Sequence, residues 1–221
     1  MPLRNRLLPT GEIVADPARG TLTGNRGCLH GTGRDLGVSR WRSKLWICCV
    51  LDWRGIRRDP MPPNRWTMLF FLDEATALAA GHRPCAYCRR ADYLSYVEAW
   101  RTGHGLAERP RAVEMDAVLH AQRVVSRTRQ QVTRPAVAGD LPDGVMVRVG
   151  GEIGLFAAAA FRPWSFTGYG EPAPLPPDTA VDLLTPPASV AALRAGYHPV
   201  LHPSAAARPA DLGNSGLVSE P

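Results

Sequence analysis

The segment "LFFLDEATALAAGHRPCAYCRR", residues 69–90, contains the features that decide the fold of this chain. Its apolar run ends at Asp73, which is a favourable N-cap for a short helix, and Gly81 is the residue expected to end that helix. Cys85 and Cys88 then follow at the spacing with which one turn presents two thiols to a metal ion. The segment therefore predicts a strand, a helix and half of a metal site.

The same two cysteines could instead form a redox pair. A redox Cys-x-x-Cys motif opens a helix at the end of a strand, whereas this pair follows a helix, so the order of elements favours a metal. The number of cysteines is odd, and all of them precede residue 89: Cys28, Cys48, Cys49, Cys85 and Cys88. In a reducing compartment, such a set indicates metal ligands or buried thiols before disulfides.

A structural zinc site needs four nitrogen or sulfur ligands, usually supplied as two local pairs. The best second pair is Cys28 with His30 in "GNRGCLHGTG", a glycine-rich turn. Cys48 and Cys49 are adjacent in a predicted strand, where neighbouring side chains point to opposite faces, so both cannot easily bind one ion. Either of them could replace His30. The sequence thus predicts Zn²⁺ at Cys85, Cys88 and Cys28, with His30 as the preferred fourth ligand.

The net charge of +6 is unevenly distributed along the 221 residues. Residues 1–134 carry 21 Arg and one Lys against 12 acids, and residues 135–221 carry four Arg against eight acids. A basic N-terminal part favours a polyanionic partner, most simply double-stranded DNA held by its phosphates, over a plain solvated surface. The arginines expected to contact phosphate are Arg26, Arg40, Arg42, Arg54, Arg57, Arg58, Arg89 and Arg90.

The chain is expected to have an α+β fold, with a small zinc-stapled hairpin and helix in its N-terminal part and a β-rich C-terminal part. The predicted boundaries are 1–108 for a basic zinc-binding domain, 109–202 for a helix and β-rich domain, and 203–221 for a mobile tail. Strands are predicted within 41–55 and 66–72, paired as a hairpin, and helices within 90–100 and 109–131. Residues 1–22 and 23–37 read as irregular.

Two features bear on the compartment. No run of 18 apolar residues predicts a transmembrane helix, and the first 20 residues lack the continuous apolar stretch of a secretory signal. The expected location is therefore cytoplasmic.

The order of residues in 66–90 resembles the zinc-binding module of the bacterial Ada-type DNA alkylation-response proteins. The matching residues are Phe71, Glu74, Ala75, Gly81, Arg83, Pro84, Cys85 and Cys88, with His82 at a place that is aromatic in that family. The resemblance implies zinc and contact with the DNA backbone. It does not carry over methyl transfer, because the helix-turn-helix and the Pro-Cys-His-Arg acceptor motif are absent, and the Cys28–His30 spacing is shorter than in the family. It leaves open whether Cys28 is reactive.

The segment "FRPWSFTGYG", residues 161–170, supplies Trp164, Phe166 and Tyr169. Aromatic rings can stack on or enclose a base, and together with the Ada resemblance they favour a reader of methylated DNA, with 5-methylcytosine as the expected modification. For the rings taken by themselves, a small core of the C-terminal half is the favoured interpretation, because aromatic side chains are usually buried.

A second alternative function is a metal-dependent nuclease or another enzyme that processes nucleic acid. Asp116 and His120 lie four residues apart on a predicted helix and so share one face. That pair could bind a metal or transfer protons. A structural role for both residues is the favoured interpretation, because Asp/His pairs at this spacing arise often on helices. A non-enzymatic role is the preferred interpretation, because no other catalytic motif is present.

Overall fold

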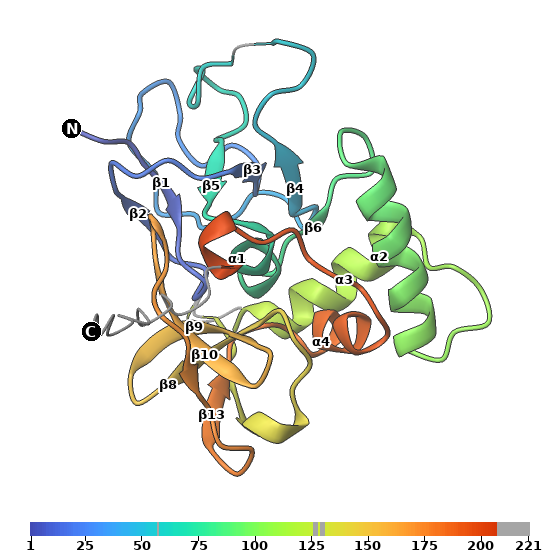
Figure 1. Ribbon diagram of the computed structural model, residues 1–221. Coiled ribbons are helices and arrows are strands. Elements are labelled where there is room, and N and C mark those ends of the chain that lie inside the picture. Colours follow the sequence, from blue (N-terminus) through green and yellow to red (C-terminus); the bar gives the residue numbers. More distant parts are fainter. Residues whose placement is uncertain (57, 126–127, 129–130, 207–221) are drawn as a thin grey trace, which may run out of the picture.

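The computed structural model describes residues 1–221 except 57, 126–127, 129–130 and 207–221. Two β-sheets lie on either side of a short central helix, and three further helices gather beside them (Figure 1). This arrangement confirms the α+β class. Within the described residues, no helix has both the length and the apolar character that crossing a membrane requires. Most of the tail expected at 203–221 lies outside the described residues.

The N-terminal sheet has the strand order β2-β1-β5-β3-β4-β6. Its strands are β1 (Arg4–Leu7), β2 (Ile13–Ala15), β3 (Leu22–Asn25), β4 (Ile47–Val50), β5 (Leu69–Phe71) and β6 (Arg83–Pro84). The expected hairpin between 41–55 and 66–72 is wrong, because β3 lies between β4 and β5: Thr23 is opposite both Cys49 and Phe70. Residues 1–22 form two strands rather than an irregular arm, since Leu7 and Ile13 bury apolar side chains in the core.

Helix α1 (Glu74–Ala79) lies between the two sheets and begins where the sequence predicts. The Asp73 side chain accepts a hydrogen bond from the Thr76 backbone N–H at 3.0 Å, so the N-cap is confirmed. The two acids at this end also hold the C-terminal part of the chain. The Tyr169 hydroxyl donates to Asp73 and the Tyr197 hydroxyl donates to Glu74, each at 2.7 Å. All six residues of the helix are buried.

The remaining helices are α2 (Arg90–Gly103), α3 (Ala112–Arg123) and α4 (Pro187–Arg194). They pack against each other and against the second sheet in one apolar cluster, which includes Tyr96, Trp100, Met115, Val147 and Leu193. The cluster therefore joins side chains from both sides of residue 108, where the sequence predicts a domain boundary. Apolar contacts across that position couple α2 to the C-terminal half.

The C-terminal sheet has the order β11-β10-β9-β8-β13-β7, with β12 paired to β10. Its strands are β7 (Arg134–Val137), β8 (Val145–Val149), β9 (Glu152–Ala157), β10 (Ala160–Ser165), β11 (Gly168–Tyr169), β12 (Ala173–Pro174) and β13 (Ala180–Leu183). Gly150 and Gly151 form the turn between β8 and β9: both residues have positive φ, 56° and 92°, as a tight hairpin turn requires. A second apolar cluster joins β8 and β9 to α1 through Met146, Leu155 and Ala75.

Candidate metal centre and arginine pocket

Three cysteines come together beside the N-terminal sheet. Cys49 lies on β4, and Cys85 and Cys88 lie in the turn between β6 and α2; their sulfur atoms are all within 4.8 Å of one another. The parallel pairing of β4 with β6, which sets Cys48 opposite Pro84, brings Cys49 to this turn. Four sulfurs around a zinc ion lie about 3.8 Å apart, given zinc–sulfur distances of about 2.3 Å. The group could therefore hold a metal ion with small movements, and it includes the predicted ligands Cys85 and Cys88.

The turn stabilises a thiolate at Cys85. Its sulfur accepts a hydrogen bond from the Tyr87 backbone N–H at 3.4 Å. The Cys49 thiol is the main cause that lowers the pKa of Cys85 to about 5, with help from the N–H groups of Cys88 and Tyr87 and against the effect of burial. Hydrogen bonding to Cys85 raises the pKa of Cys49, and burial raises the pKa of Cys88. Metal binding requires thiolates. The lowered pKa of Cys85 and the raised pKa values of Cys49 and Cys88 favour a single thiolate, at Cys85, before an ion binds.

Cys48 and Cys49 point to opposite faces of β4. Cys48 is 1% exposed and packs in the apolar core of the N-terminal sheet, where it lies 3.6 Å from a guanidinium nitrogen of Arg89. Burial raises its pKa. Of the two cysteines that could replace His30, the structure brings Cys49 to the metal site.

Cys28 and His30 are not brought to Cys85 and Cys88. The Cys28 thiol donates to the His30 carbonyl oxygen at 2.8 Å, and both ring nitrogens of His30 have partners, Thr67 at 2.6 Å and Pro62 at 3.0 Å. The antiparallel register explains the separation. Thr23 is opposite Cys49, so each later residue of β3 lies further from Cys49, and Cys28 comes after the strand has ended.

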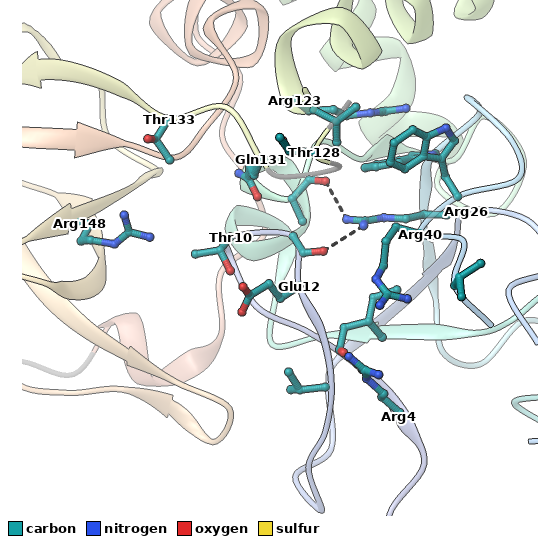
Figure 2. A pocket seen from close by; sticks show the side chains of 18 residues that line it. Arg4, Thr10, Glu12, Arg26, Arg40, Arg123, Thr128, Gln131, Thr133 and Arg148 are labelled. Atoms are coloured by element: carbon teal, nitrogen blue, oxygen red, sulfur yellow. Dashed lines mark hydrogen bonds between the residues drawn. The ribbon is translucent and has the colours of Figure 1, made fainter. Parts of the chain in front are cut away.

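An arginine pocket of about 840 Å³ lies where the N-terminal sheet, the end of α3 and the C-terminal sheet meet (Figure 2). Among its described lining residues there is one acid, Glu12, and the basic residues are Arg4, Arg26, Arg40, Arg123 and Arg148. Arg148 stands across the pocket from Arg4 and Arg40. Such an excess of guanidinium groups gives the pocket a positive potential.

Two of these arginines are buried in the pocket wall around one tryptophan. The guanidinium carbons of Arg26 and Arg123 lie over the Trp46 ring, 3.8 and 3.5 Å from its centroid. Arg26 donates to the carbonyl oxygens of Gly11 and Ala80, drawn as dashed lines in Figure 2. Arg123 donates to the carbonyl oxygens of residues 81 and 44. Neither Nε atom has a hydrogen-bond partner within the described part of the chain.

Burial and neighbouring positive charges shift the pKa values of these two arginines and of His82. Burial, and then the charge of Arg123, lower the pKa of Arg26 well below its ordinary value. Burial also lowers the pKa of Arg123 to about 9, although Asp116 counteracts it. The pKa of His82 lies well below its ordinary value because burial and both arginines outweigh the carbonyl oxygens nearby, so the ring is neutral at pH 7. The wall thus holds positive charge that its own carbonyl groups compensate only in part.

The arginines expected to contact phosphate lie in different parts of the structure. Arg26 and Arg40 line the arginine pocket, whereas Arg89 is buried and held by Glu74 through two hydrogen bonds of 2.8 Å, so it cannot reach a phosphate here. The others that the structure describes lie elsewhere on the surface: Arg42, Arg54, Arg58 and Arg90. Arg57 lies outside the described residues.

No relative identifies this chain. Comparisons with protein-family models, with curated proteins and with solved structures find no match. The geometry of the two sites therefore carries the functional argument alone.

Asp116 and His120 do not form an acid–base or metal site. Asp116 is 1% exposed and pairs with Arg83 through two hydrogen bonds of 2.9 and 2.7 Å. His120 faces Arg123, with 3.2 Å between their nitrogens, and stacks edge-on against Trp41. Burial and Arg123 lower the pKa of His120 to about 4. Both side chains therefore make structural contacts: Asp116 binds Arg83, and His120 packs between Arg123 and Trp41.

The aromatic residues expected to read a base are buried to different degrees. Tyr169 is 8% exposed and donates to Asp73. Trp164 donates from its ring nitrogen to the Thr76 hydroxyl at 3.1 Å, and the Phe166 ring packs on it with centroids 4.8 Å apart. Tyr169 is thus unavailable to a base, whereas Trp164 and Phe166 are half-buried and the Trp164 ring is held against α1.

Sequence reasoning missed the main features of the pocket. Arg4, Arg123 and Arg148 come from three distant segments, and no local pattern marks them as neighbours. The strongest available signal was the general excess of arginine before residue 135, which points to a basic surface without placing it.

Proposed function

We propose that this protein binds double-stranded DNA by its phosphate backbone, that the arginine pocket is the main contact, and that a zinc ion at Cys49, Cys85 and Cys88 fastens the adjacent strands. The observation that carries the proposal is the pair of buried guanidinium groups of Arg26 and Arg123 in the wall of an open, acid-poor pocket.

The electrostatics of the wall favour an anionic ligand. A buried cation is stable only when hydrogen bonds or an opposite charge compensate for the lost water. Asp116, the acid that acts on Arg123, is already bonded to Arg83. Within the described residues, the hydrogen bonds of the Arg26 guanidinium go to carbonyl oxygens. A phosphate in the pocket would supply the missing negative charge.

The shape of the pocket favours a sugar–phosphate strand. Arg4 and Arg40 on one side and Arg148 on the other can contact successive phosphates, while Thr10 and Gln131 add polar groups between them. Contacts of this kind position a strand without reading its sequence. The half-buried ring of Trp41 adds an aromatic surface to the same wall.

Zinc is the ion that the cysteine group favours. Thiolates are soft ligands, and clusters of cysteine in a tetrahedral arrangement select zinc among the common divalent ions. The cluster joins β4 to the turn before α2, so an ion there ties the sheet to the helix that packs on the C-terminal half.

The test is fluorescence anisotropy of a labelled duplex at several salt concentrations. The double variant Arg40→Gln/Arg148→Gln should weaken binding about tenfold or more in low salt and reduce the slope of log affinity against log salt by about two, one for each lost phosphate contact. The matched control is Arg54→Gln/Arg90→Gln, which removes two exposed charges outside the pocket and should change the affinity less than threefold.

The reverse ranking, in which the control loses affinity and the pocket variant keeps it, would place the DNA on the metal-bearing side and overturn the proposal. Binding that does not respond to salt would overturn a backbone-driven mode. The same anisotropy titration with a 5-methylcytosine duplex of identical sequence tests for a preference for methylated DNA. Because Tyr169 is buried and the Trp164 ring is held by the Thr76 hydroxyl, methylated and plain duplexes are expected to bind alike.

A further inference from the structure

We propose that a metal ion at the cysteine cluster keeps an exchangeable fourth coordination position, and that this position takes the sulfur of a small thiol with an apolar body. The ligand would lie in the aromatic groove, defined by Ile47, Val50, Trp53, Trp66, Met68 and Tyr87. The inference rests on the metal part of the proposed function and is independent of DNA.

The cluster offers three ligands from the described residues. The other two cysteines are committed elsewhere: Cys48 packs in the core and Cys28 donates to a carbonyl oxygen. The nearest acid in the sequence, Asp52, accepts a hydrogen bond from the Gly55 N–H at 2.8 Å and does not belong to the cluster. Zinc bound by three protein ligands takes a water or a ligand at its fourth position, as sites that bind substrates do.

The fourth position faces the aromatic groove. A cavity of about 360 Å³ is bounded by all three cysteines and by the groove residues, which is a size suited to a small molecule. Two of its rings are open to solvent, since Trp66 is 64% and Tyr87 68% exposed. Exposed aromatic surface beside an open coordination position favours a ligand that covers it with apolar atoms.

The charge and softness of the site favour a thiolate. Sulfur is the ligand that suits a zinc ion already bound by thiolates. Arg58 lines the same cavity and supplies a positive charge beside the site. On binding, the thiol gives its proton to bulk water, and the solvent at the fourth position leaves as the metal–sulfur bond forms.

The experiment uses the full-length protein loaded with Co²⁺, whose visible and near-ultraviolet spectrum reports its ligands. Phenylmethanethiol and 2-mercaptoethanol are the probes, because their thiol groups are similarly acidic and only one carries an aromatic ring. Phenylmethanethiol should raise the sulfur-to-cobalt charge-transfer absorbance by about one third, as three metal–sulfur bonds become four. It should bind about tenfold more tightly than 2-mercaptoethanol, because its ring is buried in the groove.

The variant Trp66→Ala should bring the affinity for phenylmethanethiol close to that for 2-mercaptoethanol, with cobalt content unchanged. Val118→Ala, which truncates an exposed apolar side chain on α3, should leave both affinities as they are. Bound cobalt with a spectrum that neither thiol alters would overturn the open position while leaving the metal site intact. Equal affinity for the two thiols in the unaltered protein would overturn the groove as the place of the ligand.

Discussion

His82 shows how a single residue is fixed by its surroundings. It is fully buried, with ring centroids 4.7 Å from Phe71 and 5.2 Å from Trp46, and neither ring nitrogen has a hydrogen-bond partner of regular geometry among the described residues. The site uses the imidazole as an aromatic ring. Protonation there would add a third cation beside Arg26 and Arg123.

We expect His82→Phe to raise the free energy of unfolding by about 1 kcal/mol at pH 7.5, because two unsatisfied polar atoms leave the core. The gain should grow as the pH falls below about 6.5. The folded pKa of His82 is lowered, so only the unfolded chain takes up its proton in that range, and the unaltered protein loses up to about 1.4 kcal/mol per pH unit.

Urea titrations at pH 7.5 and 5.5 measure the difference in unfolding free energy between the unaltered protein and His82→Phe. Any release of metal by acid affects both proteins and cancels in this difference. His198→Phe is the control for the substitution itself, since the His198 side chain is exposed. A constant difference between the two pH values would mean that His82 is not held neutral.

At the scale of elements, the end of α1 and the end of α3 are fitted to each other. Gly81 has φ of +81°, and a Cβ built on it would lie 2.3 Å from Cδ of Arg123. Gly196, which follows α4, has φ of +97° but meets nothing within 4 Å. Both positions have the left-handed backbone conformation that favours glycine. Only at Gly81 would an added Cβ also collide with a neighbouring side chain.

Gly196→Ala should therefore cost about 1 kcal/mol in unfolding free energy from backbone strain alone, and Gly81→Ala about 2–4 kcal/mol. The excess reports the displacement of Arg123, so Gly81→Ala should also weaken DNA binding while Gly196→Ala should not. Denaturant titration and anisotropy on the two variants measure both effects. Equal costs at the two positions would show that the Arg123 stem moves aside freely.

The cysteine cluster links β4 with the turn after β6, and its ligands can be told apart by substitution. Cys49→Ser should lower the bound zinc from about one per chain to well below one half and reduce stability, since binding and folding are coupled. Cys28→Ser should retain the metal, because Cys28 lies away from the cluster. Metal analysis after dialysis distinguishes them. Loss of zinc from Cys28→Ser to the same extent would restore the ligand set that the sequence alone suggests.

At the scale of the whole molecule, the two sheets share their apolar contacts. Tyr96 and Trp100 of α2 pack with Val147 and Leu193, and the acids at the start of α1 are bonded to Tyr169 and Tyr197. Separation at residue 108 would expose these aromatic rings and leave Asp73 and Glu74 without their tyrosine partners. The two halves therefore stabilise each other through side chains rather than through the chain connection alone.

We expect one cooperative unfolding transition in urea, with tryptophan fluorescence and far-ultraviolet circular dichroism changing at the same midpoint. A fragment of residues 1–108 should lack the near-ultraviolet signal of packed aromatic rings. Two separated transitions, or a folded 1–108 fragment, would contradict this and support the division predicted from the sequence.

The features that the sequence by itself determined are local. The Asp73 cap, the Cys85–Cys88 turn and the Gly150-Gly151 hairpin depend on residues within a few positions of one another, whose geometry is set by backbone preferences and short hydrogen bonds.

The tertiary structure alone decided which distant residues meet. The insertion of β3 between β4 and β5 separates Cys28 from Cys85, and the parallel pairing of β4 with β6 brings Cys49 to it instead. The arginine pocket and the buried position of Tyr169 likewise depend on how two sheets pack around α1. Strand register and packing arise from burial summed over the whole core, and no short pattern in the sequence encodes that sum.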